Sequence, residues 1–274
     1  MSVKAADVAK LRKATGAGMM DCKKALVEAE GDFDKAVEAI RKKGMAIANK
    51  RADREATEGV VLAKVSEDKK YGAMITLNCE TDFVAKNEDF VAFAAQILDL
   101  ALENKPADLE ALKALELDGR KVEEHVTEKT GVIGEKIDLS FFDKIEAEAS
   151  VAYIHAGNKL ATLIGFNKEV ELQMGKDVAM QAAAMAPIAI DKDGVDADVV
   201  AKELEIAKDK ARLEGKPEQM LDKIAQGRLG KFFKESTLLN QDFVKDGKMS
   251  VKQYLTGADK ELTVVAMKRF TLNA

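Results

Sequence analysis

The feature that most constrains the fold of this chain is a strand–strand–helix pattern that occurs twice. In the first copy, two apolar segments, "GVVLAKV" (59–65) and "YGAMITLNC" (71–79), are separated by the polar segment "SEDKK", which is typical of a hairpin loop. A helix is predicted after residue 88, where apolar residues recur with i, i+3 and i+4 spacing. These residues are Phe90, Phe93, Ala94, Ile97, Leu98 and Ala101. Strands followed by a helix in this way predict the α+β class.

The same order returns in the second half of the chain. "SVAYIHAGNKLATLIGF" (150–166) predicts two strands around the turn "HAGN", and "KDVAMQAAAM" (176–185) resembles "DFVAFAAQIL" (89–98) at an offset of 87 residues. The final segment, "ELTVVAMKRFTLNA", alternates in a way that predicts a late strand closing the second sheet. We therefore predict a duplicated α+β core, with one subdomain at 55–145 and the other at 146–197 together with 229–274.

Three short helical patterns precede the first copy. They occupy residues 3–43, and Asp32 can cap the third, which is expected to end before Gly44. Residues 49–58 are charged and without periodicity, as in a connector. Residues 1–54 carry 13 Lys or Arg against 8 Asp or Glu, whereas the rest of the chain carries 30 against 40. This asymmetry favours a separate, basic three-helix domain with its connector at 1–54.

A further insertion is predicted within the second subdomain, at residues 198–228. Two narrow apolar stripes flank "EGKPE" (214–218), which predicts a turn. The stripes consist of Val200, Leu204, Ala207 and Ala211, and then of Met220, Leu221, Ile224 and Ala225. The pattern predicts an antiparallel helix hairpin that protrudes as an interaction arm.

The composition excludes several classes of protein. No segment of the 274-residue chain approaches the length of roughly 20 uncharged apolar residues that a membrane helix needs. The start of the chain has no apolar region of the kind found in a secretory signal. Its two cysteines, Cys22 and Cys79, lie far apart and outside any CxxC motif, which favours a reducing compartment. We expect a cytoplasmic protein with no membrane partner, in which both cysteines are small buried residues.

Motifs that carry chemistry are absent. The sequence has no P-loop, and the glycines of "GVIGEK" (131–136) lack a phosphate-binding context. His125 and His155 are isolated and form no metal-ligand pattern with the cysteines. A Cys–His enzyme that uses Cys79 stays open as a hypothesis. The favoured interpretation is a protein that is not an enzyme, has no catalytic residue, metal or cofactor, and works by binding.

One stretch is not explained by the repeated pattern. "ETDFVAKNE" places Phe83 and Val84 between the predicted strand and helix of the first copy, whereas the second copy has "NKEVELQMGK", without an aromatic residue. If Phe83 had a packing role shared by both copies, the second copy would also need an aromatic residue at this position. Phe83 also lies seven residues before Phe90 and could join the apolar face of that helix. The sequence therefore leaves burial of Phe83 as the alternative to exposure.

Two stretches resemble the signatures of the elongation factor Ts family. These are "LRKATGAGMMDCKKAL" (11–26) and "LNCETDFVAKNEDF" (77–90), each more than ten residues long and in the order found in the family. The resemblance extends along nearly the whole chain. It implies a ubiquitin-associated-like three-helix domain, then duplicated α+β core subdomains, with a helix hairpin inserted in the second.

The resemblance also implies a function and the residues that perform it. Members of the family bind the GDP form of elongation factor Tu, disturb its Mg²⁺ site and release GDP, so that GTP can bind during translation elongation. Phe83 is expected to insert between helices of the partner, and Thr81, Asp82 and Val84 to help disturb the Mg²⁺ site. The remaining expected contacts are Met19, Met20, Lys23, Ile133, Gly134, His155 and Val244.

Other interpretations of these residues remain. Methionines on a small helix are often core residues, so burial of Met19 or Met20 is the alternative, and His155 at a turn is ordinarily solvated. Thr76 stands where the family has an acidic residue, and we expect this departure to change only the strand surface. Lys245 follows Val244 where an apolar residue can occur, which puts the contact at Val244 in doubt.

Alternatives also remain for the partner and the assembly. An RNA-associated translation protein that acts through the basic module at 1–54 is the alternative function. RNA-binding signatures with interleaved aromatic residues are absent, so no direct contact with nucleic acid is expected. The sequence is compatible with a homodimer or with a heterotetramer that contains elongation factor Tu.

Overall fold

Three helices form the N-terminal domain in the computed structural model, which describes residues 3–272. They are α1 (Ala5–Thr15), α2 (Met19–Glu28) and α3 (Phe33–Arg51). Leu11, Cys22 and Leu26 are among the buried residues of their common core. As expected, Asp32 caps α3, because its carboxylate accepts hydrogen bonds from the backbone N–H groups of Asp34 and Lys35.

The end expected for α3 is wrong. The helix continues through Gly44, which is buried, and ends at Arg51. A glycine inside a helix costs about 1 kcal/mol relative to alanine, so tertiary contacts decide its place. Gly44 packs against Gly131 of a later helix.

The first subdomain contains a three-stranded antiparallel sheet in the order β1-β2-β5. Its strands are β1 (Glu58–Val65), β2 (Tyr71–Cys79) and β5 (Asp138–Glu146). The short helix α4 (Asp82–Ala85) follows β2, and α5 (Glu88–Asn104) packs on the sheet through Phe90, Phe93 and Ile97. The two predicted strands and the predicted helix are confirmed.

The chain between α5 and β5 contains elements that sequence patterns do not predict. They are α6 (Leu109–Ala114), the two-residue strands β3 (Glu116–Leu117) and β4 (Arg120–Lys121), and α7 (Val122–Ile133). Helix α7 contacts α3, so it connects the first subdomain to the N-terminal domain.

The second subdomain repeats the plan of the first. Its sheet has the order β10-β7-β6, with β6 (Ala149–Ile154), β7 (Leu160–Phe166) and β10 (Val264–Thr271), and α8 (Leu172–Met185) follows β7. In each subdomain the second strand is central, and a strand from much later in the sequence pairs with it. The repeated strand–strand–helix pattern and the late strand are confirmed.

The two sheets pack face to face. Val61, Met74, Ile145 and Leu163 belong to a buried cluster shared by both sheets. Helices α5 and α8 cover the outer faces, which explains why every residue of β2 is buried. Thr76 is fully buried in β2, so the expectation that it lies on the strand surface is wrong.

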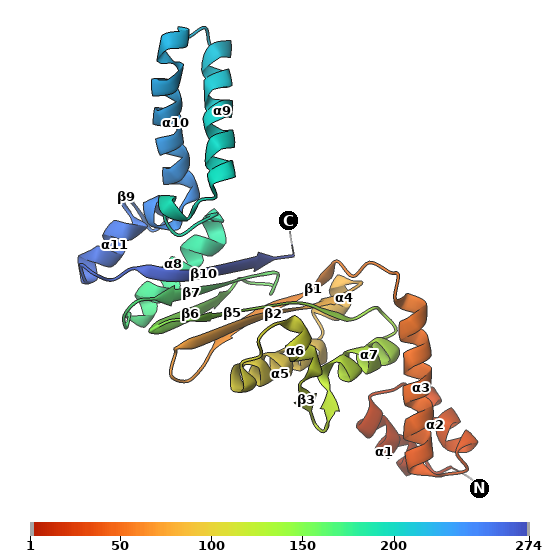
Figure 1. Cartoon of the computed structure of the whole chain (residues 1–274). Helices are drawn as coiled ribbons and strands as arrows, with labels where there is room; N and C mark the ends of the chain where they lie inside the picture. The colour runs from red at the N-terminus through yellow and green to blue at the C-terminus, as the bar shows by residue number, and fades with distance from the viewer. Residues whose placement is uncertain (1–2, 273–274) are drawn as a thin grey trace.

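The helix hairpin projects away from the sheets at the end of the molecule opposite the N-terminal domain (Figure 1). It consists of α9 (Ala197–Leu213) and α10 (Leu221–Ser236), which pack through Ala207, Ala211 and Ala225. Helix α10 therefore continues well beyond residue 228, where the sequence pattern predicts that the insertion ends. Short elements surround the hairpin: the 3-10 helices Lys192–Gly194, Glu218–Met220 and Leu238–Asn240, then β8 (Asp242–Phe243), β9 (Asp246–Ser250) and α11 (Val251–Ala258).

Candidate functional site

Phe83 is the most exposed aromatic side chain of the described residues, with 83% of its surface accessible. It lies in α4, directly after the buried end of β2. Cys79 before it and Ala85 after it are buried, and Val84 packs against the core of the first subdomain. These neighbours anchor the backbone on both sides of Phe83. We call residues 80–84 the tip.

Thr81 holds the tip against the segment that follows α7. Its backbone N–H donates to Glu135 Oε2 at 3.0 Å, and its hydroxyl donates to Glu135 Oε1 at 2.7 Å. Gly134, which ends α7 with φ of 82°, immediately precedes this carboxylate, and Ile133 packs on the core. The structure thus brings the expected contact residues Ile133 and Gly134 beside Thr81.

Glu80 connects the tip to the end of α3. Its carboxylate accepts from Arg51 at 2.7 Å, from Arg54 at 2.8 Å and from the backbone N–H of Lys136 at 2.6 Å. Partial burial by itself would raise the pKa of Glu80, but these hydrogen bonds and ion pairs outweigh it and lower the pKa to about 2. The group is therefore ionised at neutral pH and holds two segments of the chain together.

Asp82 and His155 line the same pocket, although they belong to different subdomains. The pocket has a volume of about 350 Å³, and Lys86, Lys159 and Arg269 also line it. Lys86 bonds to the Asp82 carboxylate at 2.6 Å and lowers its pKa, so Asp82 carries a negative charge at neutral pH. His155 Nδ1 lies 2.9 Å from the hydroxyl of Tyr153.

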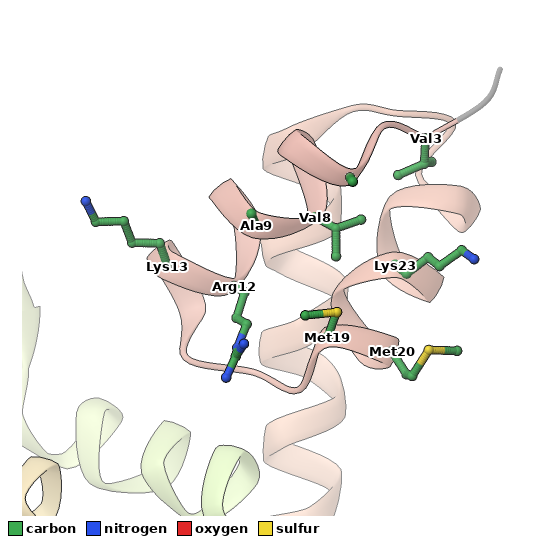
Figure 2. A pocket seen from close by; sticks show the side chains of 9 residues that line it. Val3, Val8, Ala9, Arg12, Lys13, Met19, Met20 and Lys23 are labelled. Carbon is green, nitrogen blue, oxygen red and sulfur yellow. The ribbon is translucent and has the colours of Figure 1, made fainter.

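A second concave surface lies on the N-terminal domain between α1 and α2 (Figure 2). It has a volume of about 690 Å³, and we call it the groove. Met19 and Met20 line it and are 59% and 72% exposed, so neither methionine is buried in the core. Lys23, Arg12 and Lys13 place positive charge around an otherwise apolar lining.

Val244 lies elsewhere, in the second subdomain between β8 and β9. Its side chain is 50% exposed, and its backbone N–H donates to the buried Gln181 at 2.8 Å. The neighbouring Lys245 bonds at 2.6 Å to Asp177, a carboxylate that also accepts from Tyr254. Lys245 therefore forms an ion pair within its own subdomain, and Val244 is an exposed apolar residue of this loop.

The cysteines and histidines do not form a nucleophilic pair. Cys22 and Cys79 are fully buried, as expected. Burial, together with the nearby carboxylates of Glu135 and Glu58, raises the pKa of the Cys79 thiol to about 12. A nucleophilic cysteine needs a lowered pKa, so this environment opposes the Cys–His hypothesis. In the described part of the chain, no group of three or more His, Cys, Asp or Glu side chains could hold a metal ion.

Sequence patterns do not reveal the residues that support the tip. Glu80 lies inside the segment 77–90 that carries the resemblance, but charge alone did not distinguish it from other surface carboxylates. Glu135 and Lys136 lie more than fifty residues away, and no local pattern connects them to the tip.

Comparison with known proteins identifies the family of the chain. Residues 80–274 match the family model described as "Elongation factor TS". The chain is 54% identical to the elongation factor Ts of Porphyromonas gingivalis over 276 residues, and 56% identical to that of Amoebophilus asiaticus over 277 residues; both comparisons cover all of each chain. It is 55% identical to the elongation factor Ts of Christiangramia forsetii, with 98% of each chain covered.

The family of these relatives is one of translation elongation factors. The chain belongs to the elongation factor Ts family. The family relationship implies a nucleotide exchange factor for elongation factor Tu, rather than an enzyme in the usual sense. No helix among residues 3–272 is long and apolar enough to cross a membrane.

Proposed function

We propose that this protein binds the GDP form of elongation factor Tu in the cytoplasm and uses the tip to expel the nucleotide. Phe83 inserts between helices of the partner's nucleotide domain, and Thr81, Asp82 and Val84 help to disturb the Mg²⁺ site there. The observation that carries this proposal is the exposure of Phe83 on a backbone held by buried neighbours and by Glu135. An aromatic residue fixed in this way loses little conformational entropy on binding.

The Mg²⁺ ion is the vulnerable part of the partner's nucleotide site. Mg²⁺ requires near-ideal octahedral geometry and bridges phosphate oxygens, so a small displacement of its ligands weakens the binding of the nucleotide. The ionised Asp82 adds negative charge beside the inserted ring. Exchange of this kind needs no reacting group on the factor, because factor and nucleotide are antagonistic ligands of one protein.

The tip cannot supply the whole effect. A 10⁴-fold decrease in nucleotide affinity corresponds to about 5.5 kcal/mol, whereas burial of one Phe contributes roughly 1.5–3 kcal/mol. Further contacts must supply the difference. We assign them to Met19, Met20 and Lys23 in the groove, to Ile133, Gly134 and His155 near the tip, and to Val244.

Replacement of Phe83 tests the proposal. We expect Phe83→Ala to slow stimulated release of labelled GDP by about 10- to 100-fold, which corresponds to the loss of roughly 1.5–3 kcal/mol at the transition state. Binding to nucleotide-free elongation factor Tu, measured by titration calorimetry, should weaken much less. Leu213→Ala is the matched control, because Leu213 is 89% exposed at the far end of α9.

Equal losses in release and in binding would contradict the role of Phe83, since they would show ordinary affinity and no selective effect on the nucleotide. RNA binding by the full chain, measured beside GDP release, addresses the RNA-associated alternative. If the full chain binds RNA in a salt-dependent way and leaves GDP release unchanged, the alternative is supported and the proposal fails.

A further inference from the structure

Helices α3 and α7 touch backbone to backbone at Gly44 and Gly131. A Cβ atom placed on Gly131 would lie 2.2 Å from the Cα of Gly44 and 2.9 Å from its carbonyl carbon. Both atoms belong to helix backbone and cannot move aside as a flexible side chain would. A Cβ placed on Gly44 would lie 3.5 Å from the Cα of Gly131, an ordinary contact distance. The crossing therefore depends on glycine at 131 more strictly than at 44.

The turn between α1 and α2 also packs on α7. A Cβ on Gly16 would lie 3.6 Å from Cγ1 of Val132, next to the crossing. Asp21 of α2 forms an ion pair with Lys43 of α3, beside Gly44. The groove residues Met19 and Met20 are the first residues of α2. Their position relative to the core is therefore set where α7 meets the N-terminal domain.

A second attachment holds the end of α3. Arg51 and Arg54 bond to Glu80 of the tip, as described above. Lys136 Nζ donates to the backbone oxygens of Ala52 at 2.8 Å and of Arg54 at 2.9 Å. Figure 1 shows α3 extending from the N-terminal domain toward the sheets with the end of α7 beside it. Helix α3 is thus fixed both along its length and at its end.

We propose that Gly131, with Gly44 opposite it, is a positioning residue that fixes the separation between the groove and the tip. The inference rests on the proposed function, in which both surfaces contact one partner. Two contacts held at the correct separation act together, because the second forms at a high effective concentration once the first has formed. A change in their separation removes this advantage without altering either surface.

Gly131→Ala tests the proposal with little change in chemistry. Alanine favours a helix interior over glycine, so the substitution supports α7 itself while separating it from α3. We expect the concentration of factor that half-saturates GDP release from elongation factor Tu to rise at least about tenfold. The release rate at saturation should stay within about twofold, because the tip is intact.

Two substitutions serve as controls. Gly230→Ala lies inside α10, where an added Cβ meets nothing within 4 Å, and it should leave both kinetic parameters unchanged. Gly44→Ala, at the ordinary contact distance, should do the same. If Gly131→Ala does not fold, Gly44→Leu separates the same helices from the opposite side and takes its place.

A double variant distinguishes positioning from a general loss of affinity. In the native background, Met20→Ala should raise the concentration of factor that half-saturates GDP release. In the Gly131→Ala background it should raise that concentration little further, because the groove no longer reaches its contact there. Additive effects of the two substitutions, or native half-saturation in Gly131→Ala, would overturn the proposal.

A distance measurement gives a result that does not depend on the partner. Spin labels on Lys24→Cys and Glu110→Cys would report the separation of the N-terminal domain from the core, since these side chains are 75% and 80% exposed and the native cysteines are buried. We expect one narrow distribution that shifts or broadens in Gly131→Ala. An unchanged distribution overturns the positioning role. A native protein that fails to release GDP overturns the proposed function instead, whatever the labels show.

Discussion

Phe83 and Phe90 lie seven residues apart, yet the first is 83% exposed and the second 2%. The difference arises at Asn87, whose side chain accepts from the backbone N–H groups of Asp89 and Phe90 and starts a new helix there. Phe83 is therefore not part of the apolar face of α5. Its exposure has no folding benefit, which is why we assign it to the partner.

At the same scale, Thr76 provides a test of stability. Its hydroxyl is buried between the sheets without a hydrogen-bond partner among the described residues. We expect Thr76→Val, which has nearly the same shape, to raise the free energy of unfolding by about 1 kcal/mol in urea denaturation.

Thr162→Val is the matched control for Thr76→Val. Thr162 is equally buried, but its hydroxyl donates to the backbone oxygen of Ala179 at 2.9 Å. The control should lower stability by about 1 kcal/mol because it removes that hydrogen bond. A loss of stability in Thr76→Val would show that its hydroxyl is satisfied in solution, for example by a buried water.

At the scale of elements, helix α4 and the end of α3 depend on contacts from other segments. Helix α4 has four residues and no side-chain cap, so it is too short to be stable alone. Glu80 and Glu135 hold it through Arg51, Arg54 and Thr81. Ionic as well as apolar contacts therefore hold the tip in place, and the stability that they contribute should depend on pH.

Glu80→Gln tests this dependence. The folded-state pKa of about 2 lies below the ordinary value of 4.5, so the ionised group stabilises the folded protein. This contribution is present in full above pH 4.5 and is lost as the pH falls from 4.5 to about 2. At neutral pH we expect Glu80→Gln to be less stable by about 1–2 kcal/mol. The difference from the native protein, followed by urea unfolding, should shrink below pH 4.5. A constant difference down to about pH 2 would contradict the assigned role.

At the scale of the whole molecule, the two subdomains share one buried interior. Their sheets share an interior that contains Val61, Met74, Ile145 and Leu163, and backbone bonds such as Ser150 N–H to Lys69 oxygen, at 2.6 Å, also join them. The N-terminal domain and the hairpin extend from opposite ends of this unit (Figure 1). A shared core of this kind connects the two extensions through packed elements.

Leu163→Ala tests whether the halves are cooperative. Leu163 is fully buried between the sheets, and its truncation should cost about 2–5 kcal/mol. We expect amide exchange to accelerate in β2 as well as in β7, since both strands line the same interior. Leu112→Ala, in the core of the first subdomain alone, is the control for local loss. Faster exchange in β7 without any change in β2 would show that the halves unfold separately.

Most of the regular elements could be predicted because their apolar residues follow a simple period. The spacing from Phe90 to Ala101 predicts α5, and the apolar runs at 59–65 and 71–79 predict β1 and β2. Helix α7 escaped prediction because only Val122 and Thr130 are buried in it, too few to form a visible stripe. Strand β5 was missed because most of its residues are only half-buried.

The sequence by itself determined the strand–strand–helix order that occurs twice, because the period of each element depends on neighbours a few positions apart. The candidate residues at the tip followed from the resemblance to the family. Only the tertiary structure decided that Glu135 supports Thr81, that His155 shares a pocket with Asp82, and that Gly131 packs against Gly44 of the N-terminal domain. Such contacts join segments far apart in the chain. They depend on how preformed elements pack, and the periodicity of each element carries no information about its partner in space.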